Sequence, residues 1–185
     1  MIHESLNLYW IDMKYIRNLC NNVDKRVYSV SPQLGKQERP YLGVIILCNH
    51  QKYCIPLSKP KQKHLHMRDS IDFKKIIYKG ESIGVLNFCS MIPVEDAQIH
   101  KIDVTIRKHD NEGVRKKKSI LMKELEWCRE HERDLNNTAR VLYQKYLSGD
   151  NFSARKQCLD FIKMEKECQK YNRKKLTRRI KHETK

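Results

Sequence analysis

The sequence predicts an α+β fold, an antiparallel β-sheet with helices on one side, from three observations. Up to about residue 100, short apolar stretches with strand-like alternation are separated by turn residues. From about residue 115, apolar residues recur at helical spacing within charged segments. Strands followed by helices, without an internal repeat, are typical of the α+β class. Because 185 residues suit one domain and are tight for two, we expect a single domain over residues 1–185.

The first third of the chain predicts a strand, a helix and a hairpin. Leu6–Ile11 alternates like a strand, and apolar residues within 13–20 recur at helical spacing behind it. Residues 22–40 contain two prolines and a glycine among polar residues and read as a loop. Tyr41–Cys48 and Gln51–Leu57 then form the clearest hairpin, joined by an Asn-His turn in which asparagine tolerates positive φ.

A second hairpin and an edge strand complete the predicted sheet. Phe73–Tyr78 and Ser82–Phe88 flank Lys79–Glu81, whose central glycine suits a tight turn. Met91–Val94 reads as an edge strand, because Pro93 cannot donate a ladder hydrogen bond.

Three helical stretches follow. Apolar stripes run over Ile120–Cys128 and Leu135–Tyr146, and Gly149 is positioned to end the second helix. A further helix is predicted from about Ser153 to Tyr171. The basic tail over residues 173–185 is expected to be a solvated, disordered end.

The charge balance points to a polyanionic partner. Lys and Arg number 38 against 22 acidic residues, which gives a net charge of +16. Compact chains repel themselves at such charge, and a basic surface this strong is the usual footprint of nucleic-acid binding. The alternative is a basic surface that only confers solubility. A DNA-binding repressor is disfavoured because no helix-turn-helix or zinc-module pattern is present.

The seven cysteines favour a reducing compartment. None shows C-x-x-C spacing, and most lie in apolar runs such as Val44–Cys48, where they read as small core residues. No apolar stretch approaches membrane-spanning length, and the N-terminus lacks the pattern of a secretory signal. We therefore expect a cytoplasmic protein without a membrane partner, and no metal or other cofactor.

The stretch Pro56–Arg68 is the strongest candidate site. It leaves the predicted strand ending at Leu57 and gathers one hydroxyl, three lysines, one arginine and two histidines around a proline. A solvated basic turn is the alternative interpretation, because loops often bear charge without function.

This cluster suits cleavage of RNA, which supplies its own nucleophile in the 2′-hydroxyl. The protein then needs only to orient that group, move a proton and neutralise phosphate charge. Ser58 is suited to positioning the ribose or phosphate. Lys61, crowded by two other lysines, is a candidate acid or base, as are His64 and His66. No carboxylate pair with metal-site spacing accompanies them, which disfavours a two-metal nuclease.

Three stretches together resemble the ToxN/AbiQ family, the protein toxins of type III toxin–antitoxin systems. They are Arg39–Val44 (RPYLGV), Pro56–His64 (PLSKPKQKH) and Ile83–Val94 with its IGVLNF and MIPV segments. The order and spacing of these stretches within residues 13–95 are specific to the family. The helical half resembles the family only in its general helical and charged character.

The resemblance implies a metal-independent, sequence-selective endoribonuclease that leaves 2′,3′-cyclic phosphate and 5′-hydroxyl ends. It implies inhibition by a small pseudoknotted repeat RNA, which the toxin also processes, and a closed assembly in which RNA bridges the proteins. Cellular or phage messages would be the substrates, with abortive phage infection as the outcome. The implied fold is a strongly twisted antiparallel sheet, similar to the barrel of Kid/MazF toxins, with surrounding helices and a helical C-terminal half.

The resemblance assigns roles to individual residues. The family's L-[ST]-[SK]-P-K segment falls on Leu57–Lys61, which makes Ser58 and Lys61 the catalytic candidates, while Lys59 replaces a second hydroxyl common in the family. The RNA-binding candidates are Arg39, Tyr41, Lys59, Lys63, His64 and Lys123. For Tyr41, as for Tyr53, packing within the sheet is the competing interpretation. A non-catalytic RNA-binding regulator is the alternative function.

Overall fold

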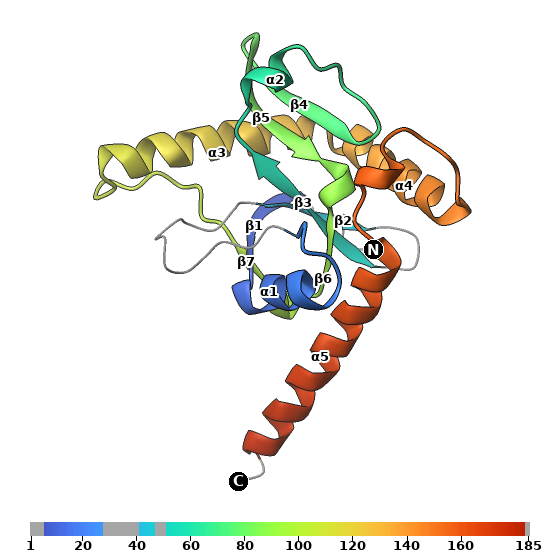
Figure 1. Cartoon of the computed structure of the whole chain (residues 1–185). Helices are drawn as coiled ribbons and strands as arrows, with labels where there is room; N and C mark the ends of the chain where they lie inside the picture. Colours follow the sequence, from blue (N-terminus) through green and yellow to red (C-terminus); the bar gives the residue numbers. More distant parts are fainter. Residues whose placement is uncertain (1–5, 28–40, 47–50, 184–185) are drawn as a thin grey trace.

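The computed structural model describes residues 6–27, 41–46 and 51–183 (Figure 1). Seven strands form an antiparallel sheet in the order β4-β5-β3-β2-β1-β7, and β6 pairs with β3 beside this path. The strands are β1 (Asn7–Ile11), β2 (Tyr41–Ile46), β3 (Lys52–Ser58), β4 (Phe73–Tyr78), β5 (Glu81–Asn87), β6 (Ile92–Val94) and β7 (Ile99–Lys101). The predicted α+β class, the predicted strands and the antiparallel pairing of both hairpins are confirmed, while the Asn-His turn predicted between β2 and β3 lies outside the described residues.

Within the described residues the sheet is open, so the predicted Kid/MazF-like barrel is not confirmed. β4 and β7 lie at its two ends and do not pair with each other. The same edge of β3 is divided between two partners: its first residues pair with β6, and only Leu57 and Ser58 pair with β5. The β4–β5 hairpin therefore joins the sheet through a short contact, which does not bring β4 round to β7.

The turn between β4 and β5 shows why this hairpin could be predicted. Lys79 has φ 49° and Gly80 has φ 83°, the two positive values that a two-residue hairpin turn requires. Glycine adopts that conformation freely, whereas lysine does so at a cost. The turn contains one residue fewer than predicted, because β5 already begins at Glu81.

Helices surround the sheet instead of lying on one side of it. α3 (Glu112–Glu130) packs on β4 and β5, α4 (Glu132–Ser148) contacts β2, and α5 (Phe161–Glu183) packs against β6 and α1 (Met13–Asn22). In Figure 1, α3 and α4 lie in the upper half and α1 and α5 in the lower half. The one-turn helix α2 (Gln62–Leu65) lies within the predicted loop after β3.

The end of α4 agrees with the prediction, whereas the end of α5 differs from it. Gly149 ends α4 with φ 82°, as predicted. The backbone of α5 continues through Glu183, so the expected disordered tail from residue 173 is helical over most of its length. Lysine and arginine, which dominate this segment, are good helix formers once the packed first half of α5 provides a nucleus.

The strand half and the helical half share one hydrophobic core. Tyr53, Tyr143 and Phe161 are fully buried at its centre, and both tyrosine hydroxyls donate 2.7 Å hydrogen bonds to Glu165 Oε1. Of the two competing interpretations of Tyr53, packing is therefore the one observed.

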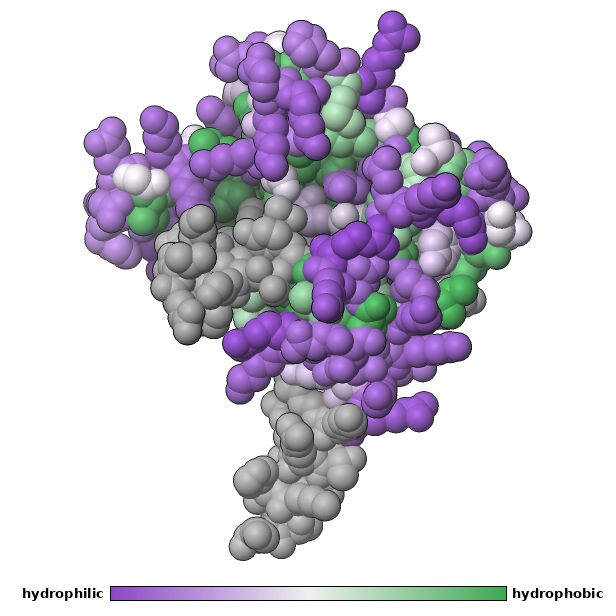
Figure 2. All heavy atoms as spheres, in the orientation of Figure 1, coloured by the Kyte–Doolittle hydropathy of each residue, from purple (hydrophilic) through white to green (hydrophobic). Residues whose placement is uncertain are grey.

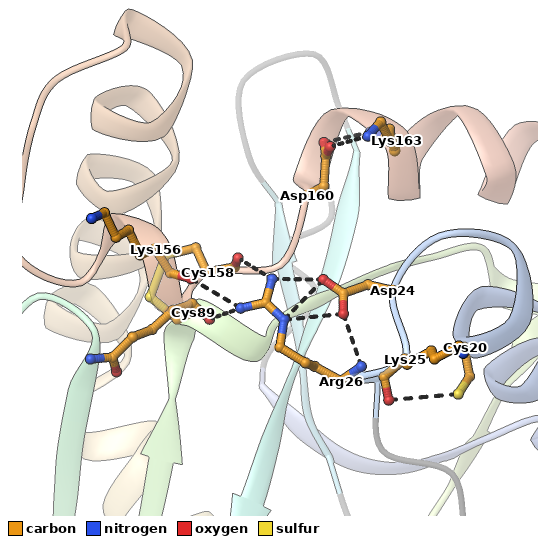
Figure 3. Close-up of polar contacts among 10 residues, drawn as sticks. Cys20, Asp24, Lys25, Arg26, Cys89, Lys156, Cys158, Asp160 and Lys163 are labelled. Atoms are coloured by element: carbon orange, nitrogen blue, oxygen red, sulfur yellow. Dashed lines mark hydrogen bonds and ion pairs between the residues drawn. A yellow bond between two sulfur atoms is a disulfide. The ribbon is translucent and has the colours of Figure 1, made fainter.

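Cys89 and Cys158 form a disulfide that joins the sheet to the start of α5 (Figure 3). Beside it, the Leu159 backbone N–H donates to the Cys89 carbonyl at 2.9 Å. This pair differs from the expectation of reduced core cysteines, because residues 69 positions apart meet only in the folded chain. The other described cysteines are free: Cys20, Cys54, Cys128 and Cys168.

Candidate functional site

The site begins where β3 ends, at Ser58. Ser58 is half-buried and pairs with Val85 of β5, which in turn pairs with Lys75 of β4. Directly opposed residues share a face of the sheet, so the hydroxyl and the half-buried Lys75 lie on one face. Sequence analysis did not single out Lys75, because its position next to Ser58's partner depends on strand register.

A histidine orders the basic loop that follows Ser58. The Lys61 backbone N–H donates to His64 Nδ1 at 3.0 Å, and the His64 N–H donates to the Lys61 carbonyl at 2.8 Å. Burial, together with the charges of Lys63 and Lys61, lowers the pKa of His64. The imidazole is therefore neutral at physiological pH, with its proton on Nε2, since Nδ1 accepts a bond.

The loop folds back over the face that contains Ser58. The rings of His64 and Phe73 lie 5.3 Å apart. Phe73 is two residues before Lys75 on β4 and so points to the same face. Lys61 and Lys63 are exposed on this loop. The structure thus brings together a half-buried hydroxyl, a neutral imidazole and two exposed ammonium groups.

Lys59 leaves the strand toward the opposite face, because successive strand residues alternate. That face of β4 and β5 is covered by α3, where Glu124 is buried with 4% exposure. Burial raises the pKa of Glu124 to about 8, and the charge of Lys59 opposes the increase. Glu124 is an ionisable group on this face that the sequence did not reveal.

Lys123 lies at the tip of the β4–β5 hairpin. Its Nζ is 4.9 Å from the centroid of the Tyr78 ring, and Lys79 Nζ is 5.6 Å from the same ring. Tyr78 is three strand residues from Lys75, a distance of roughly 10 Å along β4. The structure therefore places Lys123 near the tip of the hairpin, on the helix that covers the face opposite to Ser58, and not beside Ser58.

Tyr41 is in the core and not on an open groove. Only 3% of it is exposed, and it pairs with Pro56 at the start of β2. It lines a small cavity of about 30 Å³ together with Arg26 and Leu159. Packing of the sheet, the competing interpretation, accounts for this position. Arg39, the other candidate next to it in sequence, lies outside the described residues.

Arg26, which lines this cavity, connects two segments of the chain through its polar contacts (Figure 3). Its guanidinium binds Asp24 at 2.7 Å and donates to three consecutive backbone carbonyls, those of residues 156, 157 and 158. These bonds hold the segment before α5 against the segment after α1. Arg26 is therefore a structural cation, with its donors used inside the protein.

The basic start of α3 is also partly used within the protein. Arg115 donates to two backbone carbonyls, and Lys118 binds Asp110 at 2.8 Å. Lys117 lies 5.2 Å from the Trp10 ring centroid, and Lys116 is exposed. Figure 2 shows hydrophilic side chains over α3 and around α2.

Neither a metal-binding cluster nor a membrane-spanning helix is found among the described residues. They contain no group of three or more His, Cys, Asp or Glu side chains arranged to hold a metal ion. None of their helices is both long enough and apolar enough to span a membrane.

Comparisons with known proteins converge on one family. The family model for "Toxin ToxN, type III toxin-antitoxin system" matches residues 7–169. The chain is 26% identical to Endoribonuclease ToxN of Bacillus thuringiensis subsp. kurstaki over 149 residues, which is 74% of this chain and 70% of that protein.

Solved structures show the same fold. AbiQ, described as a lactococcal anti-phage endoribonuclease of the type III system, superposes with a TM-score of 0.76 at 20% identity. The match covers 91% of this chain and 99% of AbiQ. A structure reported for selective toxin inhibition by a non-coding RNA pseudoknot gives a TM-score of 0.72 at 24% identity, again over 91% and 99%.

Proposed function

Because the chain belongs to the ToxN family of type III toxin–antitoxin toxins, we propose that it is an endoribonuclease whose active site is the end of β3. The observation that carries this proposal is the cluster on one face of the sheet. There, the half-buried Ser58 is followed directly by a loop on which Lys61 and Lys63 are exposed, and His64 accepts a hydrogen bond from the backbone of that loop.

The reaction is a transesterification within the RNA. The 2′-oxygen attacks the adjacent phosphorus while the bond from phosphorus to the 5′-oxygen breaks, leaving a 2′,3′-cyclic phosphate and a 5′-hydroxyl. Ser58 donates a hydrogen bond to the ribose or to a phosphate oxygen. The ammonium of Lys61 stabilises the charge that develops on the phosphate, a role that needs no metal ion.

The tautomer of His64 limits its role in this chemistry. Nδ1 is occupied by the Lys61 N–H, so the neutral ring presents an Nε2–H donor and cannot accept a proton there. His64 thus acts as a hydrogen-bond donor to RNA and as a support for Lys61. Lys61 acts as an ammonium in this step, so the proton of the 2′-hydroxyl passes to a group of the RNA itself or to water.

RNA binding follows from the surrounding cations. Lys59, Lys63 and Lys123 are proposed to neutralise phosphates, as is Arg39, which lies outside the described residues. Tyr41 reaches RNA only if the small cavity around it opens, because it is buried.

The proposed partners follow those of the relatives. The proposed inhibitor is a small pseudoknotted RNA, because a non-coding RNA pseudoknot is reported to inhibit a toxin of the same fold. Processing of this RNA by the toxin and a closed, RNA-bridged assembly are part of the proposal. The substrates are cellular or phage messages in the bacterial cytoplasm, and their cleavage aborts phage infection.

The test is cleavage of RNA by the purified protein in EDTA. We expect specific cuts with cyclic phosphate ends, and Lys61→Ala should lower the rate by about 100-fold or more, as for other groups acting in a transition state. Lys166→Ala, on an exposed turn of α5, is the matched control and should cleave normally. Normal cleavage by a folded Lys61→Ala protein would overturn the assignment.

The same experiment addresses the second candidate function. A net charge of +16 equally favours an RNA-binding regulator without catalysis. Tight RNA binding with no cleavage, by the wild-type protein, would establish that alternative.

A further inference from the structure

Glu124 occupies a space that exists only because residue 84 is glycine. A Cβ atom added to Gly84 would lie 2.6 Å from Glu124 Oε1 and 3.3 Å from its Cδ. Contacts that short do not occur, so any larger residue on β5 would displace the carboxyl. Burying a carboxyl in the middle of α3 is costly, and helix periodicity alone gives no reason for it.

The register of the sheet places this carboxyl beside Lys59. Ser58 pairs with Val85, so continuing the pairing by one residue sets Lys59 opposite Gly84. Both then face α3, on the side of the sheet opposite to Ser58. The charge of Lys59 acts on Glu124 and favours its ionised form, as this placement requires.

The other groups around Glu124 leave Lys59 as its principal charged neighbour. Cys128, one turn later on α3, is fully buried, and burial raises the pKa of its thiol, which therefore stays neutral. Lys123 places its ammonium over Tyr78. From β5, the facing residues Gly84 and Leu86 bear no charge. On β4, Ile76 is apolar and lies 3.2 Å from the Gly84 Cβ position, and the ammonium of Lys74 binds Asp134 of α4 at 3.0 Å.

We propose that Glu124 regulates RNA binding through Lys59: its carboxyl, seated over Gly84 on the face that continues the register to Lys59, attracts the Lys59 ammonium when ionised and offsets its charge. This rests on the proposed function, in which Lys59 meets RNA phosphate. It also accounts for a lysine where the family commonly has a hydroxyl, since the carboxyl of Glu124 lies on the face of the sheet that Lys59 shares. Glu124 acts through Lys59 and does not itself touch RNA.

The proposal predicts a pH-dependent RNA affinity. Because the pKa of Glu124 is raised to about 8, the carboxyl is mostly neutral at pH 7 and leaves Lys59 its full charge. Above pH 8 the carboxylate draws Lys59 inward and offsets its charge. RNA binding should then weaken.

The first test does not depend on RNA. Reductive ¹³C-dimethylation of the lysines in the full-length protein allows their NMR signals to be followed from pH 6 to 10, with Lys59→Arg identifying the Lys59 signal. We expect that signal to show a step near pH 8 that is absent in Glu124→Gln. Glu126→Gln, an exposed carboxyl on the same helix, is the matched control and should retain the step. A step that persists in Glu124→Gln would overturn the proposal.

The second test measures the kinetics of RNA cleavage. Between pH 7 and 9, the KM of the wild-type protein should rise about fivefold relative to that of Glu124→Gln, with little change in the kcat ratio, as expected for one nearby charge. Gly84→Ala, which moves the carboxyl without removing it, should shift the midpoint of the Lys59 step. If no RNA is cleaved but the step is present, the proposed function fails and the Glu124–Lys59 coupling stands. Cleavage with identical pH profiles for wild type and Glu124→Gln would contradict the role in RNA binding.

Discussion

At the scale of single residues, His64 links the order of the loop to pH. Its Nδ1 accepts from the Lys61 N–H only while the ring is neutral, and its pKa lies below the ordinary value of 6.5 because of burial and of two neighbouring lysines. The stabilisation is therefore fully present above pH 6.5 and is lost as the pH falls through the lowered pKa of His64. The loop that presents Lys61 should loosen in the same range.

This argument gives a prediction for His64→Ala. The variant should lose about fivefold in kcat/KM at pH 7.5, the effect of one hydrogen bond of ~1 kcal/mol. We also expect the wild-type protein to lose activity as the pH falls through the lowered pKa of His64, and His64→Ala to lack that decline. His66→Gln, an exposed histidine two residues further on, should keep that decline. An acidic limb that is unchanged in His64→Ala would show that another group controls it.

Residue-level inference from the sequence succeeded where the signal was local. Lys61 could be assigned to a loop leaving a sheet, because the apolar stretch of β3 stops at Leu57, whereas Ser58 is the last residue of the strand and not part of the loop. Glu124 could not be found, since it is one acid among many charged residues of α3 and its burial depends on Gly84, 40 positions earlier. Tyr41 carries no local mark that distinguishes a core residue from a groove residue.

At the scale of elements, the β4–β5 turn contains one residue, Lys79, that is poorly suited to its backbone conformation. Lys79 and Gly80 both have positive φ, but only glycine adopts it without cost. Lys79→Asn should stabilise the protein by about 0.5 to 1 kcal/mol, because asparagine tolerates this conformation. Gly80→Ala should destabilise it by about 1 kcal/mol.

Urea denaturation measures both changes. Gly113→Ala is the matched control: it lies in the first turn of α3 without positive φ, and the nearest atom to its added Cβ is 3.5 Å away. Alanine should therefore be neutral or stabilising there. Equal effects of alanine at positions 80 and 113 would contradict the assigned turn geometry.

Strands and helices followed from periodicity, whereas their assembly did not. The two hairpins and the long helices were predictable from apolar spacing of two or of about 3.6 residues. β7 was missed because it has three residues, of which His100 and Lys101 are exposed. Barrel closure was inferred from resemblance and was not confirmed, since the division of one β3 edge between β5 and β6 is a long-range pairing that no local pattern encodes.

At the scale of the whole molecule, the net charge of +16 causes electrostatic repulsion within the fold. Binding of phosphates relieves this repulsion. The structure shows that this surplus is not uniformly available. Arg26, Arg115 and Lys118 are engaged with carbonyls or carboxylates inside the protein. The cations of the loop at the end of β3 are exposed instead. Net charge alone therefore overstates the number of phosphate contacts.

The salt dependence of RNA affinity measures that number. If the five proposed cations, Arg39, Lys59, Lys61, Lys63 and Lys123, each meet one phosphate, the slope of log K against log salt should be about −3.5 for single-stranded RNA, and affinity should fall roughly 100-fold between 50 and 200 mM. Lys63→Ala should reduce the steepness by about 0.7, whereas Lys166→Ala on exposed α5 should leave it unchanged. A slope near zero would contradict electrostatic recognition altogether. A slope several times steeper would mean that RNA also binds the basic surfaces of α3 and α5, so that the loop forms only part of a larger interface.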